Sequence, residues 1–162
     1  MALFGNAKKT TDSSNEEKAS TNTHEDSGVP SIVEFSVDLG DQEAPKPLPE
    51  SEYRATIRSA VKKTSQKGTQ YGEVGFFIAP DQYPADFTEG NPDGTVLFFR
   101  RVSLEDNPQA RFGTRRFIEA IGAKLGKRID LNDWLGLEAA VEVKHEEYEG
   151  VPRANIVKVR AA

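Results

Sequence analysis

The chain contains 162 residues, of which 36 % are apolar and 29 % are charged, and it carries a net charge of −5 at pH 7. That length accommodates one ordinary domain and an additional segment, and the low apolar share indicates that part of the chain has no core. The sequence has no cysteine, which excludes a disulfide scaffold and thiolate metal sites. It has no apolar run of membrane-spanning length and no secretory signal near its start, so we expect a soluble cytoplasmic protein with no membrane partner.

Residues 1–30 are rich in Lys, Thr, Ser, Asn and Glu and show no apolar period. Such a segment buries too little surface to offset its ordering entropy, so the sequence predicts a disordered N-terminal arm. The acidity of the chain also lies at this end. Residues 1–50 hold four Lys/Arg against ten Asp/Glu, whereas residues 51–162 hold 17 against 16. A near-neutral domain can bind a polyanion where its cations lie on one face.

Residues 31–39 alternate apolar and polar side chains, which is the pattern of a half-buried strand. The apolar members are Val33, Phe35, Val37 and Leu39. A proline-rich segment, 43–49, follows, and prolines are tolerated beside edge strands. We therefore predict an additional edge strand and a linker over residues 31–50, ahead of a domain at 51–162.

The domain begins with two predicted strands, 53–62 and 71–79, joined by a connector that contains the pair Lys67-Gly68. Period-two alternation divides the first strand into two faces. One face carries Tyr53, Ala55, Ile57 and Val61, and the other carries Arg54, Thr56, Arg58 and Lys62. In the second strand, Val74, Phe76 and Ile78 share one phase, and Tyr71 and Phe77 share the other. One face of this hairpin can close a core.

A third strand is predicted over 95–104, after an irregular loop rich in proline and glycine. Its phase is ambiguous because Phe98 and Phe99 are adjacent, so either both faces are partly buried or a bulge shifts the register.

Asn107-Pro108 then predicts a helix start, with an apolar stripe of Phe117, Ile118, Ile121 and Leu125 and an end near Gly126. Asp130 predicts a capped single turn through Trp134. Two strands, 137–148 and 151–159, close the chain around a Glu149-Gly150 turn.

The predicted fold class is all-β with one helix. Five strands with the helix between the third and fourth is the order of the OB-fold, a partly open Greek-key barrel. The strand at 31–39 would be an addition to that barrel.

Signatures of enzymes, metals and cofactors are missing from the sequence. There is no phosphate-binding glycine loop followed by lysine and no Gly-x-Ser-x-Gly elbow. His145 stands beside two glutamates on a predicted strand, and no second histidine of the domain could complete a metal site with it. We therefore expect a protein that is not an enzyme, with no metal and no cofactor.

A surface of cations and aromatic rings remains as the candidate site. Rings stack nucleic-acid bases, and cations neutralise phosphates. The predicted phosphate-binding residues are Arg54, Arg58, Lys62, Lys63 and Lys67; the predicted stacking residues are Tyr71, Phe77 and Phe99; Arg101 and Arg153 are secondary candidates. The alternative is that the arginines are merely solvated and that Phe77 and Phe99 pack beneath the helix or the 31–39 strand.

Several stretches together resemble phage-encoded OB-fold proteins that are similar to single-stranded-DNA-binding proteins. They are Tyr53-Arg54-Ala55-Thr56-Ile57, Lys67-Gly68-Thr69, Asp133-Trp134-Leu135-Gly136 and a final hairpin with Asn155. The resemblance covers residues 50–160 and implies non-enzymatic coating of single-stranded DNA during phage replication or recombination. It also implies replication or recombination proteins as partners in the host cytoplasm. Many such proteins end in an acidic tail, whereas this chain ends in Val159-Arg160-Ala161-Ala162. The alternative function is a viral structural or assembly protein, a homo-oligomer whose N-terminal arm and 31–39 strand contact neighbouring subunits.

Overall fold

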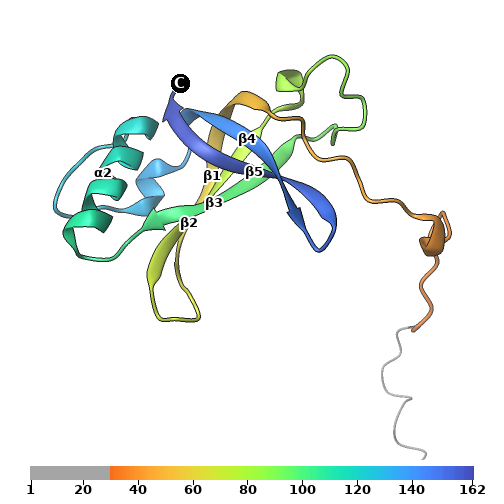
Figure 1. Cartoon of the computed structure of the whole chain (residues 1–162), viewed down its shortest axis with the longest axis horizontal. Coiled ribbons are helices and arrows are strands. Elements are labelled where there is room, and N and C mark those ends of the chain that lie inside the picture. Colours follow the sequence, from red (N-terminus) through yellow and green to blue (C-terminus); the bar gives the residue numbers. More distant parts are fainter. Residues whose placement is uncertain (1–29) are drawn as a thin grey trace, which may run out of the picture. The chain divides into compact units, whose positions relative to one another are not determined.

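The computed structural model describes residues 30–162, and the chain divides into two units between Glu43 and Ala44. The predicted arm at 1–30 therefore lies almost entirely outside the described residues. The unit Ala44–Ala162 contains the sheet and the helix (Figure 1). Leu48, from the predicted proline-rich linker, is buried in the core of this unit.

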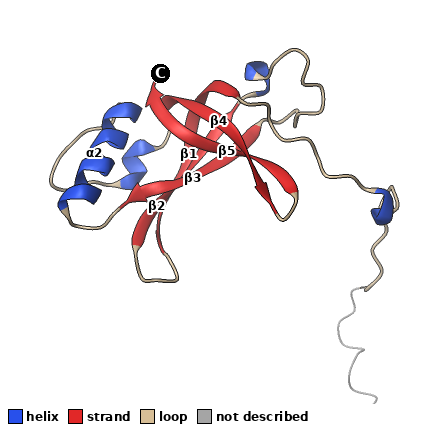
Figure 2. Ribbon diagram, in the orientation of Figure 1, coloured by secondary structure: helices blue, strands red, loops and turns tan. Residues whose placement is uncertain are grey.

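One antiparallel sheet of five strands forms the body of the second unit (Figure 2). The strands are β1 (Ser51–Thr64), β2 (Gln70–Ile78), β3 (Thr95–Ser103), β4 (Glu138–Tyr148) and β5 (Val151–Ala161). Their order is β3–β2–β1–β4–β5, so β3 and β5 are the two edges and the sheet is open. The helix α2 (Pro108–Ile121) lies between β3 and β4 in the chain. The prediction of a mostly β protein with one helix in this position is confirmed.

Local capping residues fix both ends of α2. The Asn107 side chain accepts a hydrogen bond from the backbone N–H of Ala110 at 2.9 Å, and Pro108 occupies the first turn. Gly122 ends the helix in the left-handed conformation at φ 75°. The helix therefore stops before the predicted end at Gly126, and Leu125 lies beyond it with 44 % of its surface exposed. Because the chain leaves the helix at Gly122, Leu125 does not join the apolar stripe.

The core lies between one face of the sheet and α2 together with the short 3-10 helix η5 (Leu131–Trp134). From β2, Val74, Phe76 and Ile78 are fully buried, in the predicted phase. The Phe117 ring of α2 meets Phe76 edge-on at 6.5 Å and Trp134 at 5.4 Å. These contacts attach the helix to one end of the sheet.

A bulge in β1 reverses the expected side-chain phase in its second half. The register shifts between Ile57 and Ser59, so Ala60 packs against the core and Val61 is 47 % exposed. The prediction that Val61 shares the core face with Ile57 is therefore wrong. One extra residue exchanges the faces of everything after it.

The predicted strand at 31–39 is also wrong for this structure. Residues 30–38 form no strand, and a single 3-10 turn, η3 (Leu39–Asp41), follows them. The Asp38 carboxylate accepts a hydrogen bond from the Gly40 N–H at 2.7 Å and stabilises that turn. Alternation supplies the side chains of a strand, but a strand also needs a partner for its backbone groups. Within the described residues this segment has none.

Candidate nucleic-acid interface

A groove of about 560 Å³ runs between edge strand β3 and the β4–β5 hairpin. We call it the β3–hairpin groove. Two aromatic side chains line it: Phe98 of β3, which is 41 % exposed, and Tyr148 at the hairpin tip, which is 55 % exposed. Arg100 of β3 and Arg153 of β5 line it as well. Exposed rings and guanidinium groups therefore share one concave surface.

The position of the Phe98 ring depends on a glycine in the neighbouring strand. Phe98 lies opposite Gly75 in the β2–β3 ladder. A methyl group at Gly75 would overlap the Ser59 hydroxyl and lie 3.2 Å from the Phe98 ring. Because Gly75 has no side chain, the ring lies close over the backbone of β2, a common way for an aromatic residue to cover a strand glycine.

Cations lie over three rings on this side of the sheet. The Arg100 guanidinium carbon is 5.5 Å from the centre of the Phe98 ring, and that of Arg153 is 4.5 Å from the centre of the Tyr148 ring. In the same way, Arg58 of β1 covers Phe77 of β2 at 3.3 Å. Such contacts stabilise exposed pairs by about 0.5–1 kcal/mol, little enough for a ligand to compete with them.

A buried carboxylate forms ion pairs with two cations, Arg100 and Lys63. Glu73 of β2 is 9 % exposed, and its oxygens lie 2.6 Å from Arg100 Nε and 3.1 Å from Lys63 Nζ. Burial raises the pKa of this carboxyl group, but the hydrogen bonds and charges of Arg100 and Lys63 outweigh burial and hold the pKa below its ordinary value. Glu73 is therefore ionised at neutral pH and fixes Arg100 beside Phe98.

The charge within the β3–hairpin groove is balanced. Glu146 and Glu147 of β4 line it together with the two arginines, and Glu146 lies opposite Arg153 in the β4–β5 ladder. Stacking on rings, rather than excess positive charge, is what this groove offers a ligand.

The structure divides the predicted site residues among different surfaces. The β1 bulge places Lys62 opposite Gly72, in the phase of the core residues, beside Arg128 and Asp130 in another hollow. The prediction that Lys62 shares a face with Arg54 and Arg58 is therefore wrong. Lys63 takes the opposite phase and pairs with Glu73.

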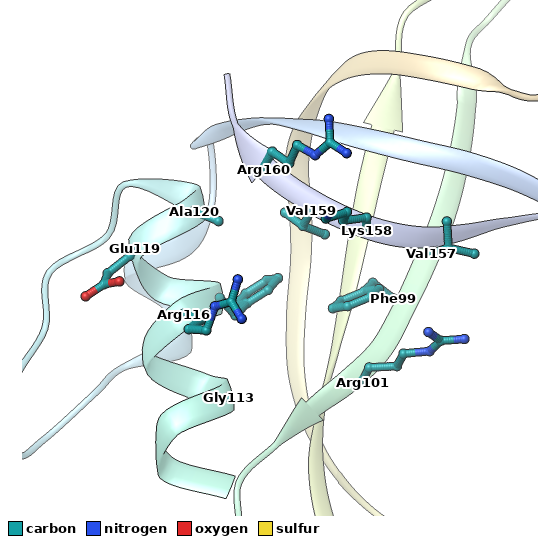
Figure 3. Close-up of a pocket in the computed structure, with 11 residues that line it drawn as sticks. Phe99, Arg101, Gly113, Arg116, Glu119, Ala120, Val157, Lys158, Val159 and Arg160 are labelled. Atoms are coloured by element: carbon teal, nitrogen blue, oxygen red, sulfur yellow. The ribbon is translucent and has the colours of Figure 1, made fainter. Parts of the chain in front are cut away.

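Phe77 and Phe99 do not form one platform. Phe77 is partly buried beneath Arg58. Phe99 lies on the helix side of the sheet, stacked on Phe117 with ring centres 5.6 Å apart and an interplanar angle of 12°. Arg101 lines the same helix-side cleft as Phe99 (Figure 3).

Of the remaining predicted residues, only Arg153 lines the β3–hairpin groove. Arg54 on β1 and Lys67 in the β1–β2 turn are exposed, and Tyr71 is half-buried at the start of β2. Phe98, Arg100 and Tyr148 were missed. The adjacent pair Phe98-Phe99 carried a signal, because only one of two neighbouring strand residues can face a core.

Among residues 30–162, no cluster of three His, Asp or Glu side chains could hold a metal ion. His145 serves the fold: its Nε2–H donates to the Leu48 carbonyl at 2.8 Å, and its backbone N–H donates to the Glu50 carboxylate. None of the helices in this described part of the chain has the length and apolar character needed to cross a membrane.

No protein-family model matches the sequence, and no curated protein matches it either.

Proposed function

We propose that this protein is a single-stranded nucleic-acid-binding protein with an OB-fold, non-enzymatic and with little sequence preference. The observation that carries the proposal is the β3–hairpin groove, where Phe98 and Tyr148 are exposed beside Arg100 and Arg153. Bases stack on such rings for roughly 1–3 kcal/mol each, whatever their identity. Two rings within one groove would hold successive bases.

The topology supports the fold in this proposal. The sheet order β3–β2–β1–β4–β5, with α2 between β3 and β4, is compatible with the order that we propose, a five-stranded Greek-key barrel that is open between β3 and β5. OB-folds bind oligonucleotides on the face of strands 2 and 3, between the β1–β2 and β4–β5 loops. The β3–hairpin groove lies against β3 and the β4–β5 turn.

The resemblance of the sequence to phage-encoded OB-fold proteins that are similar to single-stranded-DNA-binding proteins supports DNA as the ligand. It also supports a role in phage replication or recombination, with replication or recombination proteins as partners in the host cytoplasm.

Binding to an oligonucleotide of about 16 residues, the upper end of the range for one OB-fold, tests the proposal. If about three or four phosphates are neutralised, the affinity should fall roughly 20- to 50-fold between about 50 mM and 200 mM salt. Fluorescence anisotropy with a labelled oligonucleotide measures both affinities. Failure to bind at the lower salt, or an affinity indifferent to salt, would contradict the proposal.

A second candidate function is assembly, and one observation favours it. Residues 32–39 expose large apolar side chains at alternate positions, with Val33 70 %, Phe35 61 % and Val37 54 % exposed. Edge strands β3 and β5 each lack a second neighbour in the described residues. An alternating segment and an unpaired edge are the two halves of a strand-addition contact between copies of the chain.

Replacing Val33, Phe35 and Val37 by serine tests whether this segment holds copies of the chain together. If the segment adds to a neighbouring sheet, the wild-type chain is an oligomer and the triple variant is a monomer that stays folded, because none of the three side chains belongs to the core. Light scattering coupled to size exclusion measures both masses. Replacing Glu34 and Ser36 by alanine is the control, because these alternate positions would face the opposite side of the added strand. A wild-type monomer at high concentration would argue against assembly.

A further inference from the structure

A second hollow lies on the helix side of the sheet, bounded by α2, β3 and β5 (Figure 3). We call it the helix cleft, and its volume is about 650 Å³. The residues important here are Phe99 and Arg101 of β3, Gly113 and Arg116 of α2, and Lys158 and Arg160 of β5. The stacked rings of Phe99 and Phe117 form its apolar floor.

Three of the cations that line the helix cleft have no ion-pair partner in the described part of the chain. Arg101, Arg116 and Lys158 make no ion pair with any acidic group in residues 30–162. By contrast, Arg160 is held by Glu52 at 3.1 Å and Glu142 at 3.4 Å.

The acidic residue that lines the helix cleft does not compensate these three cations. Glu119 accepts a hydrogen bond from Arg115 at 2.8 Å, and its carboxylate points away from the hollow (Figure 3). Three like charges around one hollow repel one another, and an anion bound between them relieves that repulsion.

A glycine in the wall of the helix cleft supports a ligand site. Gly113 lies in the interior of α2, where glycine costs about 1 kcal/mol relative to alanine. Packing does not require it, because a methyl group at this position would meet no atom within 4 Å. A side chain there would instead project into open space beside the cleft. With glycine at this position, α2 leaves the cleft wider than it would be with a larger residue.

The helix cleft continues the β3–hairpin groove along the same two strands. On β3, residues 96–98 and Arg100 line the groove, and Phe99 and Arg101 line the cleft. On β5 the groove is lined by residues 153–155 and the cleft by residues 157–160. The open seam between β3 and β5 thus connects a charge-balanced, ring-lined surface to a positively charged one.

We propose that the helix cleft binds the phosphates of a nucleic-acid strand whose bases stack in the β3–hairpin groove, through Arg101, Arg116 and Lys158. This inference rests on the proposed function and deepens it. The groove supplies stacking with little net charge, and the cleft supplies the cations that a polyanion requires. The strand then follows the seam between β3 and β5.

Oligonucleotides of two lengths distinguish binding in the β3–hairpin groove from binding in the helix cleft. An oligonucleotide of about 4 residues, near the smallest site for one OB-fold, fits the groove, and one of about 16 residues extends beyond it. We expect Arg116→Gln combined with Lys158→Gln to weaken binding of the long oligonucleotide roughly 10- to 30-fold at about 0.1 M salt. The slope of log affinity against log salt should fall by about 1.4, at about 0.7 for each lost phosphate contact. Binding of the short oligonucleotide should not change.

Lys124→Gln combined with Lys144→Gln is the matched control, because both lysines are exposed and line neither hollow, and the charge change is the same. Gly113→Leu is a second variant, which fills the cleft without altering charge. It should weaken long-oligonucleotide binding while α2 becomes no less stable.

The outcomes distinguish the inference from the proposed function. The Arg116→Gln/Lys158→Gln variant is compared with the Lys124→Gln/Lys144→Gln control. If the two bind the long oligonucleotide with equal affinity and equal salt slope, the cleft is not a phosphate site, although the groove still binds. If the wild-type protein binds neither oligonucleotide, the proposed function itself is overturned, and this inference with it.

Discussion

Replacing both Phe98 and Tyr148 by alanine should lower the affinity for single-stranded DNA by roughly 30-fold to more than 1,000-fold. Each ring that stacks a base contributes about 1–3 kcal/mol, and two rings in one groove act on one ligand. At about 1.4 kcal/mol for each factor of ten, even the lower sum is a large loss. Anisotropy titration at low salt measures the change.

The same truncations should cost little stability. Phe98 and Tyr148 are 41 % and 55 % exposed, and substitutions at exposed positions usually change the free energy of unfolding by less than about 0.5 kcal/mol. The thermal midpoint of the double variant should therefore remain close to that of the wild type, which ensures that a loss of binding reports on the groove rather than on unfolding.

Phe112→Ala is the matched control for ring removal. Phe112 is 60 % exposed on α2 and lines neither the β3–hairpin groove nor the helix cleft. If removing Phe112 weakens binding as much as removing Phe98 does, non-specific apolar contact explains the affinity. An unchanged affinity in the double variant would exclude the groove as the base-binding surface.

Most of the architecture could be predicted from the sequence because its signals are local. The Asn107-Pro108 pair specifies a helix start through its own side chain and ring. The Glu149-Gly150 turn adopts positive φ at both residues, 52° and 80°, as a tight hairpin turn requires. Each of these features is determined by two or three neighbouring residues.

The layout of the site could not be predicted because it depends on strand pairing. The register shifts beside Ser59 in β1 and beside Gly72 in the β2–β3 ladder. The shift in β1 moves Lys62 to the core side. Phe98 and Phe99 face opposite sides because they are neighbours in one strand, and the pairing with β2 decides which of the two faces the helix. An alternation pattern shows no bulge, since a bulge is defined by the partner strand. The same dependence on a partner explains why residues 31–39 form no strand.

Glu73→Gln should have opposite effects on stability and on binding. At neutral pH we expect the variant to be less stable by about 1–2 kcal/mol. Removing one partner of a buried ion pair costs about 3–5 kcal/mol. Here Lys63 and Arg100 are 47 % and 57 % exposed, so solvent screens both pairs and reduces the loss. Urea denaturation of the wild type and the variant measures the difference.

The stability difference should depend on pH in one direction. The folded state holds the pKa of Glu73 below its ordinary value of 4.5, so the unfolded chain takes up the proton first as the pH falls. The contribution of the carboxylate is complete above pH 4.5 and disappears as the pH drops through the folded pKa. The wild type and Glu73→Gln should therefore converge in stability below pH 4.5. A difference that persists unchanged there would show that packing, not charge, is the role of Glu73.

Binding should strengthen in the same variant. Neutralising Glu73 removes the negative charge that lies 2.6 Å from Arg100 and 3.1 Å from Lys63, and both cations then become available to phosphates. Each newly neutralised phosphate should steepen the salt slope by about 0.7. Glu89→Gln is the matched control, because its ion pair with Lys46 is exposed on both sides and lies outside the groove. If Glu73→Gln binds no more tightly than Glu89→Gln, the two cations serve the fold alone, and the affinity must come from the rings and the helix cleft.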